Sequence, residues 1–248
     1  SHYFGDGFAK AFDITFTGTD NQLHYPHQTS WGVSTRLIGG IIMTHGDDNG
    51  LVLPPRIAPV QAVVIPIAQH KPGVLDAAGK LLERLQQAGV RSRMDDSDKA
   101  PGWKFAEYEM RGVPLRVEIG PKDMEKEQCC IARRDTGEKT FVPLAELEST
   151  VAKLLDDIHN NMFAMAKKNL EDNSCTAETL EQVKEITGRL GGGFVHTKWC
   201  GELACELAMK EQAGVTSRCM PLAQSGTTGK CPVCGKECTT DIIWGVAY

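Results

Sequence analysis

The chain has 248 residues, of which 41% are hydrophobic and 24% are charged, and this ordinary globular composition is enough for one large domain or two small ones. A formal net charge of −5 at pH 7 lacks a basic excess, so we expect no DNA partner, and an RNA partner would need a local basic patch. We expect no membrane partner, because no apolar run approaches the ~20 residues of a membrane span and no signal segment opens the chain.

The first block, residues 1–59, predicts a few short strands followed by one amphipathic helix. A helical turn is expected at residues 8–12, and strands at residues 14–16 and from residue 23 towards Trp31. The following apolar residues lie at helical spacing on one face. They are Val33, Leu37, Ile38, Ile41 and Ile42. Because each face of a sheet needs a covering layer, we expect this block to belong to a larger antiparallel sheet.

The two ends of this helix suggest an anion site. Ser34 is the expected N-cap, and Gly46 is expected to take the left-handed conformation that ends the helix, after His45 in its last turn. Arg36 lies in the first turn, where a cation opposes the helix dipole at a cost of roughly 0.3–1 kcal/mol. A phosphate between Arg36 and the free N–H groups would remove that cost, whereas an Arg36 in water would have no such role. The spacing alone leaves both interpretations open.

The second block, residues 60–165, alternates strands with helices, which predicts a mixed or mostly parallel α/β sheet with right-handed crossovers. The expected strands are residues 51–53, just before this block, and residues 60–67, 90–93, 114–119, 129–133 and 141–142. The expected helices are residues 73–88, residues 102–110 and a long helix from Pro143 to about Lys168. Neither a P-loop nor a G-x-G-x-x-G motif follows the first of this block's strands, so a nucleotide site of either type is not expected here.

Basic residues of this block occur at strand ends and in loops, where α/β proteins bind ligands. They are Lys99, Lys104, Arg116, Lys122 and Lys126. The acidic run at residues 95–98 would repel a phosphate nearby, and charged loops are commonly no more than solvated surface. RNA binding by this block is therefore only weakly indicated by its residues.

The third block, residues 166–248, contains most of the nine cysteines. Helices are expected at residues 176–190, with Thr176 as the cap, and at residues 202–212. Strands are expected at residues 214–222 and 241–246. An odd number of clustered cysteines favours a metal site in a reducing compartment over a disulfide framework, so we expect a cytoplasmic location.

Four of these cysteines have the spacing of metal ligands. Cys200 and Cys205 are separated by four residues, and Cys231 and Cys234 form a Cys-Pro-Val-Cys-Gly turn that directs two thiolates at one point. Four cysteine ligands close a tetrahedral zinc site and leave no position for water, so a structural zinc is predicted. Two further cysteines are near enough in sequence to compete as ligands, Cys219 and Cys238. Spacing alone also allows a zinc ribbon that reads nucleic acid.

The string Gln28-Thr29-Ser30-Trp31-Gly32-Val33-Ser34-Thr35-Arg36 resembles motif 3 of the class II aminoacyl-tRNA synthetases. Together with His45-Gly46-Asp47-Asp48 and Gly50-Leu51-Val52-Leu53-Pro54-Pro55, it looks like the prolyl-tRNA synthetases of the archaeal and eukaryotic type. The resemblance implies three parts. They are the end of an antiparallel class II catalytic domain (residues 1–59), an α/β anticodon-binding domain (residues 60–165) and a small α+β zinc-binding C-terminal domain (residues 166–248).

The resemblance also implies roles for single residues. Ser34 and Arg36 would contact ATP, with Arg36 facing the phosphates as the catalytic residue, while His2 and Trp31 would contribute to a proline pocket. The family's zinc domain favours Cys200, Cys205, Cys231 and Cys234 over the two competing cysteines. ATP, Mg²⁺ and structural Zn²⁺ are the implied cofactors. The implied partners are tRNA(Pro), L-proline and a second subunit in a homodimer.

The implied reaction is the ATP-dependent activation of proline and its transfer to tRNA. Motifs 1 and 2 of the family are not in this sequence, and the chain opens within a motif, so we expect a fragment that is inactive alone. In the family the chain end folds back towards the catalytic domain, so the resemblance implies that Tyr248 contributes to activation. Two alternatives stay open: a stand-alone RNA-binding zinc module without catalysis, and a structural remnant that has lost its chemistry.

Overall fold

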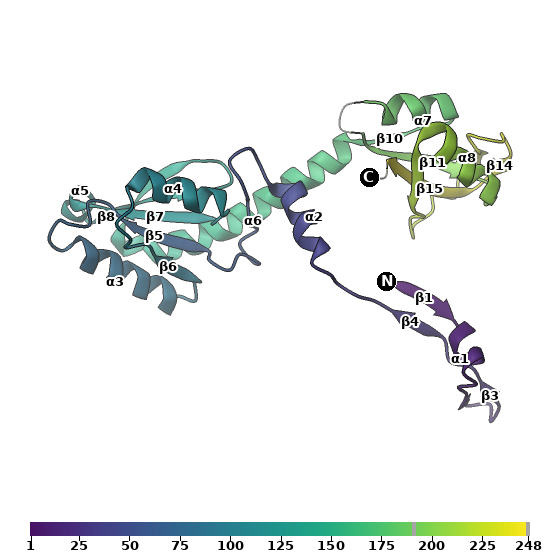
Figure 1. Cartoon of the computed structure of the whole chain (residues 1–248), viewed down its shortest axis with the longest axis horizontal. Helices are drawn as coiled ribbons and strands as arrows, with labels where there is room; N and C mark the ends of the chain where they lie inside the picture. Colours follow the sequence, from purple (N-terminus) through teal and green to yellow (C-terminus); the bar gives the residue numbers. More distant parts are fainter. Residues whose placement is uncertain (190–191, 247–248) are drawn as a thin grey trace. The chain divides into compact units, whose positions relative to one another are not determined.

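The structure is a computed structural model that describes residues 1–189 and 192–246 (Figure 1). Its contacts divide the chain into two compact units, residues 1–159 and residues 160–248, and the boundary falls inside the long helix α6 (Leu147–Asp172). The division into three domains at residues 59 and 165 stays a prediction, and Tyr248 lies outside the described residues. Among the helices described, none combines the length and apolarity needed to cross a membrane.

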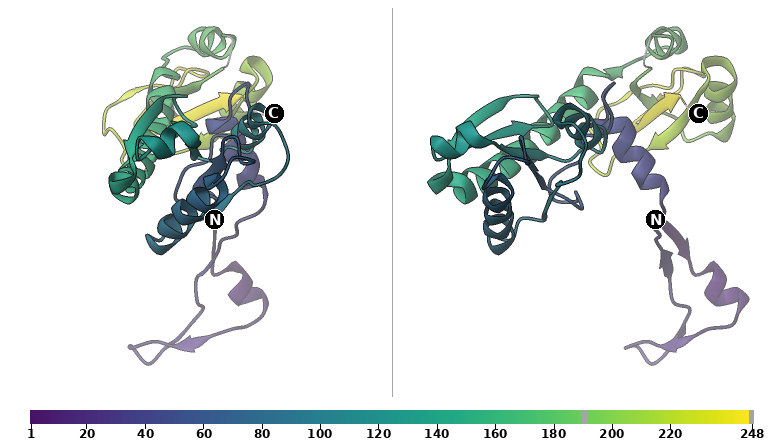
Figure 2. Two further views of the ribbon diagram at one scale, coloured as in Figure 1. Left: turned by 90° about the vertical axis from the view of Figure 1, so that its left-hand side faces the viewer. Right: turned by 60° about the vertical axis from the view of Figure 1, so that its left-hand side comes forward.

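Residues 1–35 form two small antiparallel strand pairs. Strand β1 (His2–Gly5) pairs with β4 (Gln28–Ser30), and β2 (Phe16–Thr17) pairs with β3 (Leu23–His24). The short helix α1 (Gly7–Ala11) follows β1, and Figure 2 shows β1 and β4 side by side with α1 beyond their end. Of residues 1–45, all of which the structure describes, Ala9 alone is buried, because these strands have no second layer to cover them.

The predicted helix is α2 (Arg36–His45), but its two ends differ from expectation. Thr35 is the N-cap residue, and Ser34 instead accepts a hydrogen bond at Oγ from the Arg36 backbone N–H at 3.4 Å. Gly46 is extended, with φ −68°, so the predicted left-handed conformation is wrong. A glycine is needed there for space, because a Cβ atom would lie 2.6 Å from the Ile42 carbonyl oxygen.

The segment after α2 is extended but is not the predicted strand. The backbone N–H of Leu51 donates to the Met110 carbonyl at 2.9 Å, and that of Leu53 donates to the Gly112 carbonyl at 3.2 Å. Because Met110 and Gly112 belong to a helix end and a turn, these bonds form no strand ladder.

A five-stranded mixed sheet forms the core of the first unit, in the order β6-β5-β7-β8-β9. The strands are β5 (Ala62–Pro66), β6 (Ser92–Met94), β7 (Leu115–Ile119), β8 (Gln128–Arg133) and β9 (Lys139–Pro143). Strands β6, β5 and β7 are parallel, whereas β8 and β9 are antiparallel to their neighbours, so a mostly parallel sheet is not what forms. The connections at residues 120–127 and 134–138 are shorter than the dozen or so residues that a parallel crossover needs.

Helices cover both faces of this sheet. They are α3 (Val74–Gln87), α4 (Pro101–Met110), α5 (Pro121–Glu125), the 3₁₀ helix η1 (Leu144–Glu146) and the first half of α6. Figure 1 shows α3 and α4 on opposite faces. Every residue of β5 is buried, and Val63 and Ile65 pack with Tyr108 of α4, so its alternate residues face the other layer.

The second unit is a four-stranded sheet with two helices, in the order β10-β11-β15-β12. The elements are β10 (Ser174–Thr176), α7 (Leu180–Thr187), β11 (Phe194–Trp199), α8 (Leu203–Ala213), β12 (Val215–Cys219), the hairpin β13 (Gly229–Lys230) and β14 (Glu237–Cys238), and β15 (Thr240–Val246). Thr176 ends a strand, so its predicted capping role is wrong, and Thr179 caps α7 in a reciprocal capping box with Gln182. Trp244 is fully buried in the core, where its indole N–H donates to Thr197 Oγ1 at 2.8 Å.

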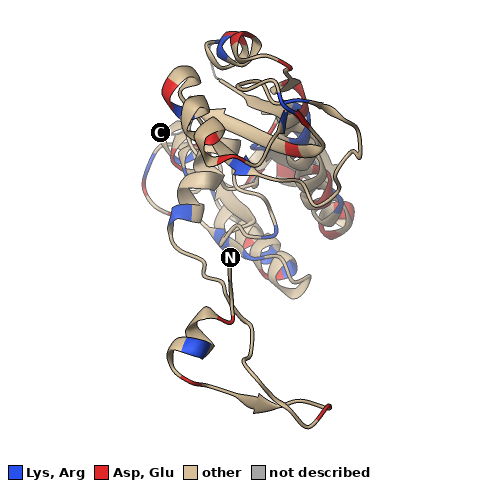
Figure 3. Ribbon diagram, turned by 90° about the vertical axis from the view of Figure 1, so that its right-hand side faces the viewer, with Lys and Arg blue, Asp and Glu red and all other residues tan. Residues whose placement is uncertain are grey.

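Lys and Arg are interspersed with Asp and Glu along the chain (Figure 3). Residues 1–45 contain only two cationic side chains apart from histidine, Lys10 and Arg36.

Candidate metal centre and cavity

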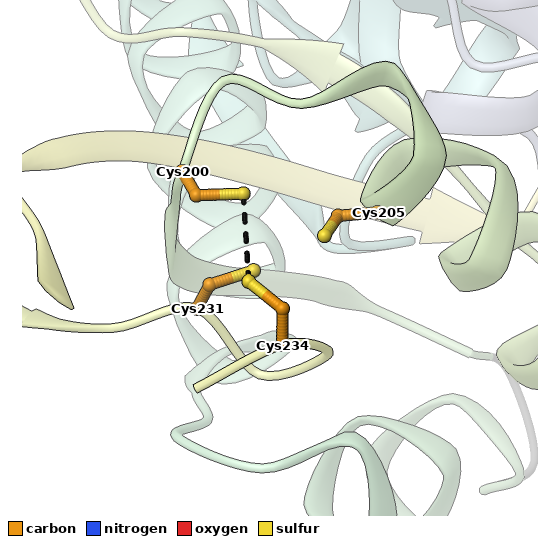
Figure 4. A group of neighbouring side chains, drawn as sticks. All are labelled: Cys200, Cys205, Cys231 and Cys234. Atoms are coloured by element: carbon orange, nitrogen blue, oxygen red, sulfur yellow. Dashed lines mark hydrogen bonds between the residues drawn. The ribbon is translucent and has the colours of Figure 1, made fainter. Parts of the chain in front are cut away.

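Four cysteines from three places in the second unit converge on one point (Figure 4). Cys200 directly follows β11, Cys205 lies in the first turn of α8, and Cys231 and Cys234 lie in the turn between β13 and β14. Their Sγ atoms all lie within 4.8 Å of one another, and those of Cys200 and Cys234 are 3.7 Å apart. A tetrahedral zinc with Zn–S bonds of ~2.3 Å places its sulfur ligands ~3.8 Å apart, so this group fits the ion.

Backbone hydrogen bonds set the shape of the turn that carries two of these cysteines. The Cys231 N–H donates to the Lys236 carbonyl at 2.9 Å, and the Gly235 N–H donates to the Cys231 carbonyl at 2.9 Å. Gly235 has φ +71°, a left-handed conformation that favours glycine. The residue after the second cysteine therefore allows the turn that aims both thiols inwards.

The environment of the thiols is suited to a cation. Burial alone would raise the pKa of Cys231, but N–H groups of Cys234, Val233 and Cys200 outweigh it and lower the pKa to about 7. Burial and the neighbouring sulfur atoms raise the pKa of Cys205 far above its usual range. Four thiolates so close together repel one another unless a positive ion lies among them, and metal binding would release their protons.

The two competing cysteines lie outside this group. Cys238 is half-buried in β14, and its pKa is raised by burial and then by the charges of Cys231, Cys200 and Cys234. Cys219 is exposed at the end of β12. The four cysteines that were predicted as ligands are thus the four that the fold brings together.

The residues predicted for ATP and proline contact lie in the N-terminal segment. Arg36 is the first residue of α2 and is exposed, and its guanidinium has no ion pair or hydrogen bond within the residues described. His2 lies opposite Ser30 in the β1–β4 pair, with its ring stacked on Phe4 at 5.6 Å between centroids. Trp31 directly follows β4, so it lies at the same end of the strand pair as His2, and its side chain is 78% exposed.

The first unit contains a cavity of about 100 Å³ that motif reasoning did not find. It lies between the end of α4, the strands β7 and β8, and the turn that leads to β9. The lining residues are Tyr108, Glu109, Val113, Arg116, Ala132, Arg133, Arg134 and Gly137. Arg116, one of the basic residues considered as a ligand contact, lies in its wall, and the consecutive arginines Arg133 and Arg134 are a further sequence signal for this place.

The charged groups of the cavity are mostly paired. Arg116 donates from Nε to Glu118 at 2.8 Å, and its guanidinium carbon lies 4.1 Å from the centre of the Phe105 ring, a cation–π contact. Arg133 donates from Nη2 to Asp135 at 2.7 Å. The Glu109 carboxylate is half-buried and has no partner among the described residues, so it is free to accept hydrogen bonds from a ligand.

Lys104, one of the lysines considered as a contact residue, is not available for binding. It is 1% exposed, and its Nζ donates to the Asp95 carbonyl at 2.8 Å and to Gln69 Oε1 at 3.1 Å. The ammonium therefore joins the loops that follow β5 and β6 instead of reaching solvent. Asp95 is buried beside it, so the acidic run is in part structural.

Comparison with known proteins first defines the class of the first unit. The family model described as "Anticodon binding domain" matches residues 61–154, from β5 into α6. The sheet with the arginine-lined cavity is therefore an anticodon-binding domain.

A second family model, "Prolyl-tRNA synthetase, C-terminal", matches residues 180–248, which include the four converging cysteines. Over all 248 residues the chain is 55% identical to "Proline--tRNA ligase" of Clostridium novyi, 56% identical to that of Ruminiclostridium cellulolyticum and 51% identical to "Proline--tRNA ligase 2" of Bacillus cereus. It spans 52% of each relative, about half of its length. The resemblance is confirmed: the chain corresponds to the C-terminal part of a prolyl-tRNA synthetase.

Proposed function

We propose that the full-length protein is a proline–tRNA ligase. It activates L-proline with ATP to prolyl-adenylate and transfers the prolyl group to tRNA(Pro). The observation that carries this proposal is the identity of more than half of the residues over the entire chain to proteins named proline–tRNA ligase. The two family matches, to an anticodon-binding domain and then, later in the sequence, to a prolyl-tRNA synthetase C-terminal domain, support the same conclusion.

Activation requires stabilisation of phosphate charge. A carboxylate oxygen of proline attacks the α-phosphorus of ATP, and pyrophosphate leaves with the electrons of the broken P–O bond. Arg36 stands at the positive end of α2, so its guanidinium and the free N–H groups of the helix would together hold the phosphates, with Ser34 as a further ATP contact. Mg²⁺, when bound with ATP, would add positive charge at the phosphates.

The amino acid would bind near the β1–β4 strand pair. The register places His2 beside the strand that leads to Trp31, so an imidazole and an indole lie at one end of the pair. An indole face packs well against a small apolar ring such as that of proline. In the second step, the terminal ribose hydroxyl of tRNA attacks the prolyl carbonyl carbon, and AMP leaves.

The tRNA anticodon would contact the cavity of the first unit. Arg116 and Arg133 supply guanidinium donors at its wall, and the unpaired Glu109 carboxylate can accept from the amino or imino groups of a base. The planar guanidinium of Arg116, held over the Phe105 ring, adds a surface of the kind on which unpaired bases stack. A base held in this way would be read by hydrogen bonds to its edge.

The four cysteines would hold a structural zinc. With all four tetrahedral positions filled by thiolates, no position is left for a reacting water, so the ion would stabilise the second unit without catalysing a step. The proposal also includes domain boundaries at residues 59 and 165. The full-length enzyme would be a homodimer in the cytoplasm. Reduced thiolates are consistent with that compartment.

The decisive experiment is proline-dependent ATP–pyrophosphate exchange by the full-length protein, followed by charging of tRNA(Pro). Exchange with proline above that with the other amino acids is the expected result. Residues 1–248 alone should show none, because motifs 1 and 2 of the family are not in this sequence. A full-length protein that binds tRNA but shows no exchange would instead be the RNA-binding zinc module without catalysis.

A further inference from the structure

The loop after α2, residues 46–53, is fastened to the anticodon-binding domain by one arginine. Arg134 donates from Nη1 to Asp47 Oδ2 at 2.7 Å and from Nη2 to Asp47 Oδ1 at 2.6 Å, a bidentate pair. Its third donor, Nε, binds the Glu109 carbonyl at 2.8 Å. The Arg134 side chain is 5% exposed, so the pair lies at the edge of the domain interior. One guanidinium therefore holds both the loop and the wall of the cavity.

Two glycines show how closely the same loop approaches the domain. At Gly50, with φ +129°, a Cβ atom would lie 2.5 Å from the Met110 carbonyl oxygen. At Gly112, with φ +70°, a Cβ atom would lie 2.6 Å from the Leu51 carbonyl oxygen. Both backbones thus come too near to allow a side chain. Leu51 and Leu53 also donate hydrogen bonds to the same turn, so the loop packs against the domain in one well-defined position.

The following residues are fastened as well. Arg91 donates from Nη2 to the Pro55 carbonyl at 2.8 Å and from Nε to the Ala58 carbonyl at 3.0 Å. Arg134 and Arg91 therefore hold the connection between α2 and the sheet at several points along its length, so it is not a flexible linker. Arg134 differs from Arg91 in that it also lines the cavity.

We infer that Asp47 and Arg134 are positioning residues for the transfer of proline to tRNA. They hold the loop that follows α2 against the wall of the anticodon cavity. This contact fixes the position of a base in the cavity relative to the chain segment that leads back to Arg36. The inference rests on the proposed function, because it concerns the tRNA-dependent step. Activation of proline does not involve the cavity and does not need this pair.

The test compares the two partial reactions in full-length variants. For Asp47→Asn, we expect proline-dependent exchange within twofold of the wild type and a fall of at least tenfold in kcat/KM for tRNA charging. Asp48→Asn is the matched control, because Asp48 is exposed and takes no part in the hydrogen bonds that join Arg134 to Asp47 and Glu109; both reactions should be unchanged. Thermal unfolding of each variant establishes that it is folded.

Arg134→Lys provides a second, independent test. A single ammonium keeps the charge but cannot bind both oxygens of Asp47 and the Glu109 carbonyl together. Charging should fall here too, and the double variant should lose no more than about twofold beyond the worse single variant, because the two changes break one interaction. If Asp47→Asn does not fold, Arg134→Lys decides alone by the same loss of charging.

Three results would overturn the inference. The first is charging by Asp47→Asn within twofold of the wild type. The second is an equal loss of exchange and charging, which would make the pair merely structural. The third is a double variant whose losses multiply. In each of these three cases, a wild-type protein that exchanges and charges normally still supports the proposed function. A wild-type protein without proline-dependent activity would overturn both the proposed function and the inference.

Discussion

Replacement of Cys231 by serine should release the metal and unfold the part of the chain around it. Cys231 is 2% exposed, and its Sγ is one of four within 4.8 Å of one another. Structural zinc in small domains binds with roughly 10–16 kcal/mol, so one of four equivalent ligands accounts for about 3–4 kcal/mol, or about two to three orders of magnitude in affinity. A serine hydroxyl is not deprotonated at neutral pH and would recover little of this.

The assay is the zinc content of the purified protein, measured by atomic absorption, with limited proteolysis of residues 194–248. We expect one zinc per chain in the wild type and substoichiometric zinc in Cys231→Ser, with faster cleavage of that segment. Cys219→Ser is the matched control, because this cysteine is exposed and outside the group. Unchanged zinc in Cys231→Ser, or loss of zinc in Cys219→Ser, would refute the ligand assignment.

Three further results are expected. Arg36→Ala should lower proline-dependent exchange by about 100-fold or more, because the phosphates lose a cation in the transition state, while tRNA binding stays intact. Glu148→Gln should cost about 1 kcal/mol of stability, since Arg84 loses its bidentate charged partner at 2.6 and 2.7 Å on a partly exposed surface. The hydrogen bond from Arg84 lowers the pKa of Glu148, so this stability is present above the usual carboxyl pKa and is lost as the pH falls through the lowered value, a dependence the variant should lack. Gly50→Ala should lower the unfolding temperature of the anticodon-binding domain, because its Cβ would lie 2.5 Å from the Met110 carbonyl oxygen.

Each of these has a control or a contrary outcome. Arg56→Ala, an exposed arginine near Arg36 in sequence, should leave exchange unchanged, and an Arg36→Ala enzyme with full exchange would exclude Arg36 from the mechanism. Unfolding free energies measured from pH 7 to pH 3 test Glu148, and parallel curves for variant and wild type would contradict the assigned pair. An unaltered unfolding temperature in Gly50→Ala would show that the loop can move aside.

Several features were predictable because they depend on residues close together in sequence. The α2 helix follows from apolar spacing, the buried strand β5 from a continuous apolar run, and the metal group from two cysteine pairs with ligand spacing. The wrong predictions concern the first residue of a helix, where several nearby residues are of a type that can cap it. Thr179 rather than Thr176 caps α7, and Thr35 rather than Ser34 precedes α2. Local patterns locate an element well and its ends less well.

The amino-acid sequence by itself determined most of the helices and strands, the four cysteines and the family. Tertiary structure alone decided the antiparallel half of the sheet, the burial of Lys104, the cavity beside Glu109 and the pairing of Asp47 with Arg134, two residues 87 positions apart. The physical reason is that periodicity and spacing report on neighbours along the chain. The partner of a charge depends on which distant segments the closed core brings within hydrogen-bond distance.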